Sequence, residues 1–235
     1  MTAIATFGRA EFLSRYWAYQ PGEHVTILGP TGSGKTWLGY QLLASSAHPK
    51  LPGVVMVMKP RDKTVTGFTK TTGFRRVRSW PPTPNLWQPR PPGYVLWPRH
   101  TFDIARDDAM MQYQFNRAML DSYRRGDRIV FADEVFGLSN ELGLNRTLLA
   151  LWTRGRSMGC GLWAASQKPT HIPLHAYSMA EHLFLFNDPD VRARKRFSEI
   201  GGIDPRLVID AVSGLRKHEA VYIRRTGPHL CIISP

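Results

Sequence analysis

Residues 25–36 read Val-Thr-Ile-Leu-Gly-Pro-Thr-Gly-Ser-Gly-Lys-Thr, and this stretch decides the fold. Its last eight residues match the pattern GxxxxGK followed by Ser or Thr at every fixed position. An apolar run (25–28) precedes the match and a helical stretch (37–45) follows it, which is the context that a phosphate-binding loop requires. We therefore predict that the loop binds ATP through Gly29, Pro30, Thr31, Gly32, Ser33, Gly34, Lys35 and Thr36.

Each part of this loop has a chemical task. The glycines let the backbone curl so that successive N–H groups face the phosphates. The helix that begins near Lys35 adds the positive end of its dipole. We expect the Lys35 ammonium to reach the β- and γ-phosphates, and the Thr36 hydroxyl to bind Mg²⁺.

A second motif delivers two carboxylates. Residues 128–134 read Arg-Ile-Val-Phe-Ala-Asp-Glu, an apolar strand that ends in Asp133 and Glu134. Because α/β sheets bind ligands at the carboxyl ends of their strands, we predict that Asp133 holds Mg²⁺, directly or through water. Glu134 would then polarise the water that attacks the γ-phosphate. The alternative is a structural role, in which Glu134 caps the following turn.

The alternation of strands and helices predicts one α/β domain over residues 1–235, with a mostly parallel sheet flanked by helices. We expect strands at 25–28, 54–58, 129–132, 162–166 and 183–186, with a C-terminal hairpin at 220–225 and 229–233. We expect helices at 37–45, 107–125, 142–154 and 190–200.

The charge balance points to a polyanionic partner. The chain carries 31 Lys and Arg against 18 Asp and Glu, a formal net charge of +13. Such an excess favours nucleic acid as a partner, whereas the alternative is a basic surface that serves solubility. No stretch approaches the roughly 20 apolar residues that cross a bilayer, and residues 1–20 do not resemble a signal peptide. We therefore expect a cytoplasmic protein without a membrane span.

Residues 59–99 concentrate the positive charge. They also carry three tryptophans, at 80, 87 and 97, among many prolines. Basic residues interleaved with aromatic rings suit a contact with nucleic acid, so we predict a basic Pro/Trp-rich insertion that contacts DNA. The alternative is a Pro-rich excursion whose tryptophans anchor it to the sheet. The single acid is Asp62, and the nine basic residues are Lys59, Arg61, Lys63, Lys70, Arg75, Arg76, Arg78, Arg90 and Arg99.

A third block follows the acidic pair. It consists of Gly155-Arg156, a small-residue turn at 157–161, an apolar strand at 162–166 and Gln167-Lys168-Pro169. In this order of features the chain resembles the FtsK/HerA group of DNA-pumping P-loop ATPases. The resemblance extends from about residue 25 to 225, although the stretch between 59 and 105 matches no part of it.

The resemblance implies a RecA-like (ASCE) P-loop core that assembles into a homo-oligomeric ring, a pentamer or hexamer, around DNA. It also implies that Arg156, or failing it Arg154, reaches a neighbour's ATP as an arginine finger, and that Gln167 senses the γ-phosphate. A guanidinium supplied in trans would offset the charge that develops on the γ-phosphoryl group. The alternatives are that both arginines cap the end of their helix and that Gln167 makes an ordinary strand-end hydrogen bond.

Within this group we expect a minimal motor. The sequence shows no membrane anchor, no separate DNA-reading domain and no nuclease-like carboxylate cluster. The expected function is ATP-driven translocation of double-stranded DNA with ATP and Mg²⁺ as cofactors, as in viral and phage genome-packaging ATPases that dock on a portal or capsid vertex. A conjugation or plasmid-transfer DNA pump stays open, as does a protein-directed assembly or secretion ATPase of the filamentous-phage type.

Overall fold

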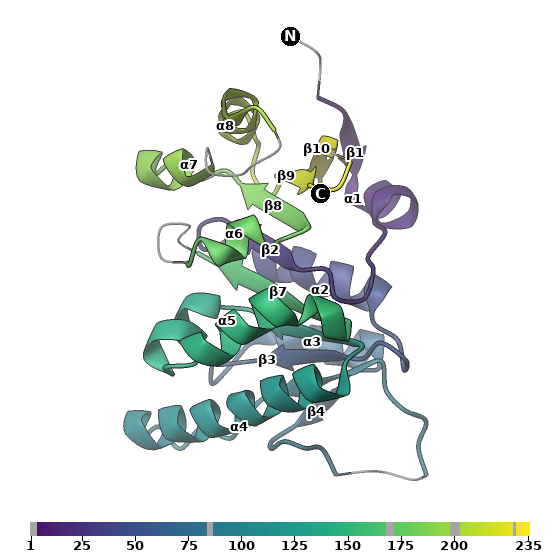
Figure 1. Ribbon diagram of the computed structural model, residues 1–235, viewed down its shortest axis with the longest axis vertical. Coiled ribbons are helices and arrows are strands. Elements are labelled where there is room, and N and C mark those ends of the chain that lie inside the picture. Colours follow the sequence, from purple (N-terminus) through teal and green to yellow (C-terminus); the bar gives the residue numbers. More distant parts are fainter. Residues whose placement is uncertain (1–3, 84–86, 168–171, 198–202, 228) are drawn as a thin grey trace.

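The computed structural model describes residues 4–83, 87–167, 172–197, 203–227 and 229–235. A ten-stranded sheet crosses this part of the chain in the order β1-β10-β9-β8-β2-β7-β6-β3-β5-β4 (Figure 1). Every neighbouring pair is parallel except β8–β9 and β9–β10. The strands are β1 (Thr6–Gly8), β2 (Val25–Leu28), β3 (Gly53–Met56), β4 (Arg75–Val77), β5 (Gly93–Leu96), β6 (Arg128–Ala132), β7 (Cys160–Ser166), β8 (His182–Phe186), β9 (Ala220–Arg224) and β10 (His229–Ser234).

Helices connect the parallel strands. The described α-helices are α1 (Arg9–Glu11), α2 (Lys35–Ser46), α3 (Lys63–Thr72), α4 (Ile104–Arg125), α5 (Asn145–Arg154), α6 (His175–Ser178), α7 (Val191–Phe197) and α8 (Pro205–Ser213). Three short turns of other helix types are η1 (Phe12–Tyr16), η2 (Gly137–Glu141) and η3 (Arg156–Met158). Within the described ranges, no helix is both long and apolar enough to cross a membrane.

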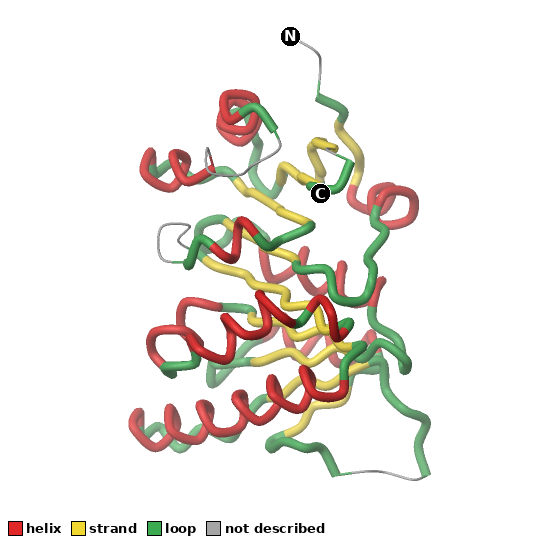
Figure 2. The backbone as a smooth tube through the Cα atoms, viewed as in Figure 1, coloured by secondary structure: helices red, strands yellow, loops and turns green. Residues whose placement is uncertain are grey.

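The sheet separates two apolar layers (Figure 2). Helices α4, α5 and α6 cover the face nearer the viewer, whereas α2 and α3 lie behind the sheet. Buried side chains of α4 and α5, such as Phe115 and Leu148, form the first core with one set of strand residues. Leu38 of α2 and Phe68 of α3 form the second core with the alternate set. Strands buried on both faces read as continuous apolar runs, which is the pattern that predicted them.

The parallel pairing aligns the carboxyl ends of the central strands. In the β2–β7 pair Leu28 lies opposite Ser166, and in the β6–β7 pair Ala132 lies opposite Ala164. The segments that follow β2, β6 and β7 therefore leave the sheet at one common edge. This edge lies at the left of Figure 1, where the segment after β7 begins.

The predicted fold class is confirmed, and most element positions agree to within a few residues. Strand 25–28 has the predicted bounds, and helix α4 begins at Ile104 because the Asp103 side chain accepts a hydrogen bond from the N–H of Arg106. The helix expected at 142–154 begins only at Asn145, after the separate turn η2. Residues 198–200 of the helix expected at 190–200 lie outside the described residues.

Residues 59–99 differ from the expected excursion, because much of the segment belongs to the core fold. It forms α3 and contributes β4 and β5 to the sheet edge next to β3. Trp80 and Trp97 are buried, as the anchoring alternative expected, and the Trp97 indole donates to the carbonyl of Lys59. Trp87 is 96% exposed. The segment was misread because its strands are only three and four residues long and carry arginines or a glycine.

Substitutions at two glycines of this region, Gly93 and Gly67, test how closely β5 packs against β3 and Phe74. Gly93 pairs with Gly53 across β5 and β3, and a Cβ at Gly93 would lie 2.2 Å from the Phe74 ring and 2.4 Å from the Gly53 carbonyl oxygen. We expect Gly93→Ala to lower the free energy of unfolding by about 2 kcal/mol, because the neighbouring backbone cannot yield easily. Gly67→Ala is the matched control: Gly67 lies on the exposed side of α3 with open space around it, so the substitution should raise stability by about 0.5–1 kcal/mol. Urea unfolding measures both, and equal effects would contradict this packing.

Candidate nucleotide-binding site

The phosphate loop connects β2 to α2 at the common edge. Gly32 and Gly34 have φ values of 79° and 106°, which L side chains rarely adopt, so glycine is required at these points of the curl. Gly29 has a different reason: an added Cβ would lie 2.5 Å from the Cβ of Phe186 on β8. Helix α2 begins at Lys35, directly after the loop, so its amino-terminal N–H groups face the same space.

Two loop side chains are already positioned by the chain. The Lys35 ammonium donates to the Pro30 carbonyl over 2.9 Å, which holds the buried side chain against the loop. Burial lowers the pKa of Lys35, and the carboxylates of Glu134 and Asp133 oppose that shift. The Thr36 hydroxyl donates to Asp133 Oδ1 over 2.9 Å, although 97 residues separate the two. The structure thus brings together the two motifs that the sequence analysis paired.

The acidic pair follows β6, as predicted. Burial raises the pKa of Asp133, against the opposing effect of the Thr36 hydrogen bond. Burial likewise raises the pKa of Glu134, which accepts hydrogen bonds from the Phe136 backbone and, over 3.3 Å, from the Ser166 hydroxyl. The bond from Phe136 is the turn-capping contact that was the structural alternative for Glu134. The same carboxylate also accepts the hydrogen bond from Ser166, which lies at the sheet edge where the phosphate loop begins.

Gln167 lies at the end of the strand next to the acidic one, as expected. Its amide oxygen accepts a hydrogen bond from the Thr31 hydroxyl over 2.6 Å. Strand β7 therefore connects two parts of the site, since Ser166 contacts Glu134 and the next residue contacts the phosphate loop. Lys168 and Pro169 of the same block lie outside the described residues.

His218 contacts the phosphate loop, and no sequence pattern predicted this contact. Its ring Nδ1–H donates to the Ser33 carbonyl over 3.0 Å, and its own carbonyl accepts from Arg9 Nη2 over 3.1 Å. A cavity of about 320 Å³ adjoins these residues, lined by Phe186 and Leu215 among others. No sequence signal marks His218, because it lies 185 residues from Ser33 and belongs to no motif.

Arg154 and Arg156 lie at the other edge of the sheet. They precede β7, whereas Gln167 follows it, and seven strand residues span about 20 Å. Both arginines are exposed, and neither guanidinium has a hydrogen bond or ion pair among the described residues. Arg154 is the last residue of α5, which is the position that the helix-end alternative expects, and neither arginine can reach the phosphate loop of its own chain.

A second cavity, of about 410 Å³, adjoins Glu134. Its charged lining is mainly acidic and includes Asp108 and Glu141 together with Lys59. Phe102 and Ile104 on its rim are 77% and 79% exposed, although both are large apolar side chains. The chain thus presents an acidic and apolar surface directly beside the residue that would activate water.

The oxygen atoms at the site suit Mg²⁺. Thr36 Oγ1 and Asp133 Oδ1 lie 2.9 Å apart at the start of α2, and Asp133 is half-buried. Mg²⁺ prefers oxygen ligands and usually takes only one or two from protein, completing its shell with substrate phosphates and water. The two side chains therefore fit the ion that accompanies ATP.

Neither a family model nor a curated protein matches the chain, but solved structures share its fold. The genome packaging NTPase B204 from Sulfolobus turreted icosahedral virus 2, in complex with sulfate, has a TM-score of 0.65 at 13% identity, covering 92% of this chain and 98% of that one. The same protein in complex with AMPPCP has a TM-score of 0.63 at 14% identity, covering 92% and 100%. VirB4 of Thermoanaerobacter pseudethanolicus has a TM-score of 0.65 at 10% identity, covering 90% and 89%. The chain thus has the fold of these proteins, which is the P-loop α/β fold that the sequence predicted.

The His218 contact leads to a testable expectation. His218→Ala removes one hydrogen bond to the loop backbone, worth about 1 kcal/mol, so the Kd for a fluorescent ATP analogue should rise about fivefold. His175→Ala removes an exposed histidine of α6 and should leave the Kd unchanged. Equal nucleotide affinity in both variants would contradict a role for His218 in positioning the loop.

Proposed function

We propose that the chain is an ATP-driven DNA translocase that works as a ring, most closely a genome-packaging motor of viral type. The observation that carries the ATPase part is the Thr36–Asp133 hydrogen bond, which joins the two phosphate-site motifs at one sheet edge beside Glu134 and Gln167. The names of the structural neighbours support the rest, since they include a DNA-packaging ATPase, a conjugation coupling protein and a secretion ATPase.

The chemistry follows from the positions of the side chains. The backbone N–H groups of residues 29–36 and the Lys35 ammonium bind the phosphates and offset their charge. Mg²⁺, when bound by Thr36 and Asp133, neutralises charge on the β- and γ-phosphates. Glu134 orients a water and accepts its proton. At the same time the water oxygen bonds to the γ-phosphorus and the bond from that phosphorus to the ADP oxygen breaks. Gln167, held by Thr31, lies where it can respond to the presence of the γ-phosphate.

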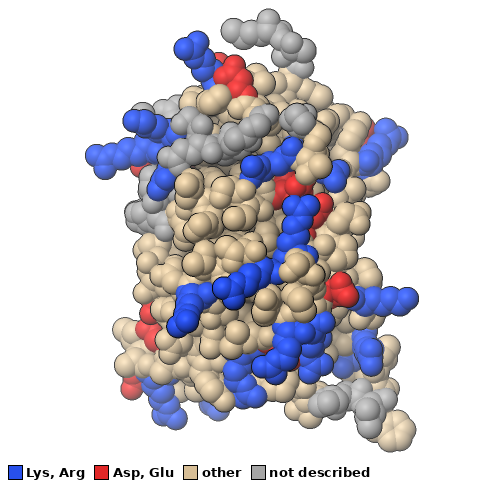
Figure 3. All heavy atoms as spheres, viewed as in Figure 1, with Lys and Arg blue, Asp and Glu red and all other residues tan. Residues whose placement is uncertain are grey.

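Charge supports DNA as the partner. The +13 excess is far from neutral, and Figure 3 shows Lys and Arg spread widely over one face of the molecule while Asp and Glu are sparse on it. A surface of this kind attracts phosphate backbones without reading base sequence. This is the behaviour that a translocase needs, because it must move along any sequence.

The separation of the two arginines from the ATP site of their own chain supports a ring. Arg154 and Arg156 lie at one edge of the sheet, and the acidic cavity beside Glu134 lies at the other. A head-to-tail contact would bring the arginines of one copy to the acidic cavity of the next, and repetition of such a contact closes a ring. In this arrangement Arg156, with Arg154 as the second candidate, completes the neighbour's site.

The match extends over nearly the whole of the packaging NTPase B204 and over 89% of VirB4. B204 is covered over 98% of its length by this chain. The type VII secretion ATPase EccC of Thermomonospora curvata (TM-score 0.56, 16% identity) and the pCW3 conjugation coupling protein TcpA (0.51, 15%) are covered over only 25% and 59%, for 91% and 89% of this chain. A conjugation pump and a protein-directed ATPase are the alternatives that the following measurement separates.

The first expectation concerns ATP hydrolysis by the purified chain with and without long double-stranded DNA. DNA should stimulate the rate several-fold, and Glu134→Gln should lower the rate by about 100-fold or more while ATP still binds, because the general base is absent. DNA stimulation should weaken steeply between about 50 and 200 mM salt. If DNA does not change the rate of ATP hydrolysis at any salt concentration, the assignment as an ATPase is unaffected and a protein-directed motor is favoured.

The second expectation concerns the trans arrangement. Arg156→Ala should abolish hydrolysis without weakening ATP binding, and Lys35→Ala should abolish hydrolysis because no ammonium then binds the phosphates. When the two inactive variants are mixed, activity should recover to about a quarter of the wild-type rate, since intact sites form where a Lys35→Ala subunit supplies Arg156 to its neighbour. Parallel mixing with Arg154→Ala decides between the two arginines. Complete failure of both mixtures in assemblies shown to exchange subunits would contradict a finger in trans.

A further inference from the structure

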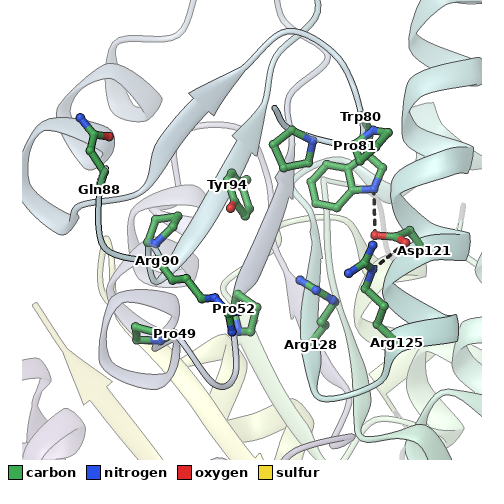
Figure 4. Close-up of a pocket in the computed structure, with 12 residues that line it drawn as sticks. Pro49, Pro52, Trp80, Pro81, Gln88, Arg90, Tyr94, Asp121, Arg125 and Arg128 are labelled. Carbon is green, nitrogen blue, oxygen red and sulfur yellow. Dashed lines mark hydrogen bonds and ion pairs between the residues drawn. The ribbon is translucent and has the colours of Figure 1, made fainter. Parts of the chain in front are cut away.

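A cavity at the edge of the sheet opposite the phosphate loop has no part in ATP chemistry. Its volume is about 540 Å³, and it lies between the start of β5, the start of β6 and the end of α4 (Figure 4). Prolines form much of its wall, and the side chains of Trp80 and Tyr94 line it. Their rings meet edge to face with centroids 5.8 Å apart.

Three guanidinium groups converge on this cleft from different elements. Arg90 comes from the segment before β5, Arg125 is the last residue of α4, and Arg128 is the first residue of β6. Figure 4 shows Arg90 on one side of the cavity and the other two on the opposite side. Three cations and the one acid that lines the cavity give it a net charge of +2.

That acid, Asp121, is already engaged. Its Oδ1 accepts from Arg125 Nε over 2.8 Å, and its Oδ2 accepts from the Trp80 indole over 3.2 Å. Among the described residues, neither Arg90 nor Arg128 forms an ion pair. The cleft therefore presents cations whose charge the protein itself does not balance.

Arg128 shows this imbalance most clearly. Its Nε is buried and has no hydrogen-bond partner among the described residues. Burial lowers the pKa of Arg128, and the nearby Asp121 only partly opposes the effect. A desolvated guanidinium without a full counter-charge is costly, and an anion entering the cleft would relieve that cost.

The walls of the cleft are held in place before any ligand arrives. The Trp80 backbone N–H donates to the side chain of Gln114 on α4 over 2.6 Å. Arg75 of β4 donates to the Pro89 carbonyl over 2.7 Å, which ties down the segment that carries Arg90. A site prepared in this way binds an anion with little loss of conformational entropy.

We propose that this cleft binds phosphate groups of a nucleic-acid backbone, which deepens the proposed function and rests on it. Planar guanidinium groups match phosphate oxygens in pairs, and several of them around one cavity suit a phosphodiester. Beside the cleft, the backbone N–H groups of Asp127 and Arg128 donate to the carbonyls of Met158 and Gly159. These bonds hold the turn that carries the exposed arginines 154 and 156 next to the cleft.

The same contacts imply coupling between DNA and ATP. The backbone bonds of Asp127 and Arg128 to the turn at 155–159 are 3.0 and 3.2 Å long, so the cleft and the arginine turn form one packed unit. DNA held in the cleft of one subunit would therefore position the arginines that enter the ATP site of the next. DNA stimulation of hydrolysis should consequently depend on the cleft.

The test uses the full chain and the double variant Arg90→Gln, Arg125→Gln, whose two side chains are exposed. The affinity for a short labelled DNA duplex should fall about tenfold, and the slope of log K against log salt should become shallower by about 1 for each phosphate that the variant no longer binds. The matched control is Lys70→Gln, which removes an exposed charge on α3 of the same basic segment and should change affinity less than about twofold. Urea unfolding checks that each variant folds.

A second arm identifies the source of the phosphate. Inorganic phosphate alone is titrated against the wild type and the double variant while thermal stability is followed. Stabilisation of the wild type only, with unchanged duplex affinity, would assign the cleft to a free phosphate compound and overturn the nucleic-acid proposal. An equal loss of duplex affinity in Lys70→Gln and the double variant would overturn it too, because a diffuse basic surface would then explain the binding.

Hydrolysis separates this proposal from the proposed function. The double variant should hydrolyse ATP without DNA at the wild-type rate, since the cleft lies at the edge away from the phosphate loop, but DNA should no longer stimulate it. Full stimulation by DNA in the double variant would overturn the proposal that the cleft binds DNA, without affecting the proposal that the protein is a DNA translocase. A wild type that neither binds DNA nor responds to it would instead overturn the translocase itself.

Discussion

The parallel pairing of β2, β7 and β6 is the constraint on which the site depends. Because these three strands run side by side in one direction, the segments that follow them meet at one edge. Backbone hydrogen bonds fix their register, and the apolar layers on both faces prevent any slip, since a shift by one residue would exchange the faces. The Thr36–Asp133 and Thr31–Gln167 hydrogen bonds are consequences of that pairing, not independent features.

The site that results is electrostatically costly without its ligands. Burial lowers the pKa of Lys35 and raises those of Asp133 and Glu134, so each group is held where its charged form is disfavoured. Such groups are tolerated because their charges lie close together and because phosphates and a cation would complete the set. Holding these groups at this edge lowers the stability of the protein, and under the proposed function the same arrangement is a preformed site for ATP.

The two ends of β7 give the molecule a direction. One end carries Ser166 and Gln167 at the phosphate loop, and the other carries the arginine turn and adjoins the cleft of Arg90, Arg125 and Arg128. Acidic and basic surfaces at opposite edges cannot contact each other within one chain, and the proposed head-to-tail contact between copies would bring them together.

The sequence by itself determined the α/β class, the phosphate loop, the acidic pair and the position of Gln167. These follow from local patterns: glycine spacing, apolar runs and the residues directly after a strand, which act over a few positions along the chain. Only the tertiary structure decided that residues 59–99 form α3, β4 and β5, because strands of three or four residues gain their stability from neighbours and not from their own composition. It also decided that His218 contacts Ser33 across 185 residues and that Arg90, Arg125 and Arg128 surround one cavity. Contacts of this kind depend on which elements the sheet places side by side, and no spacing along the chain records that.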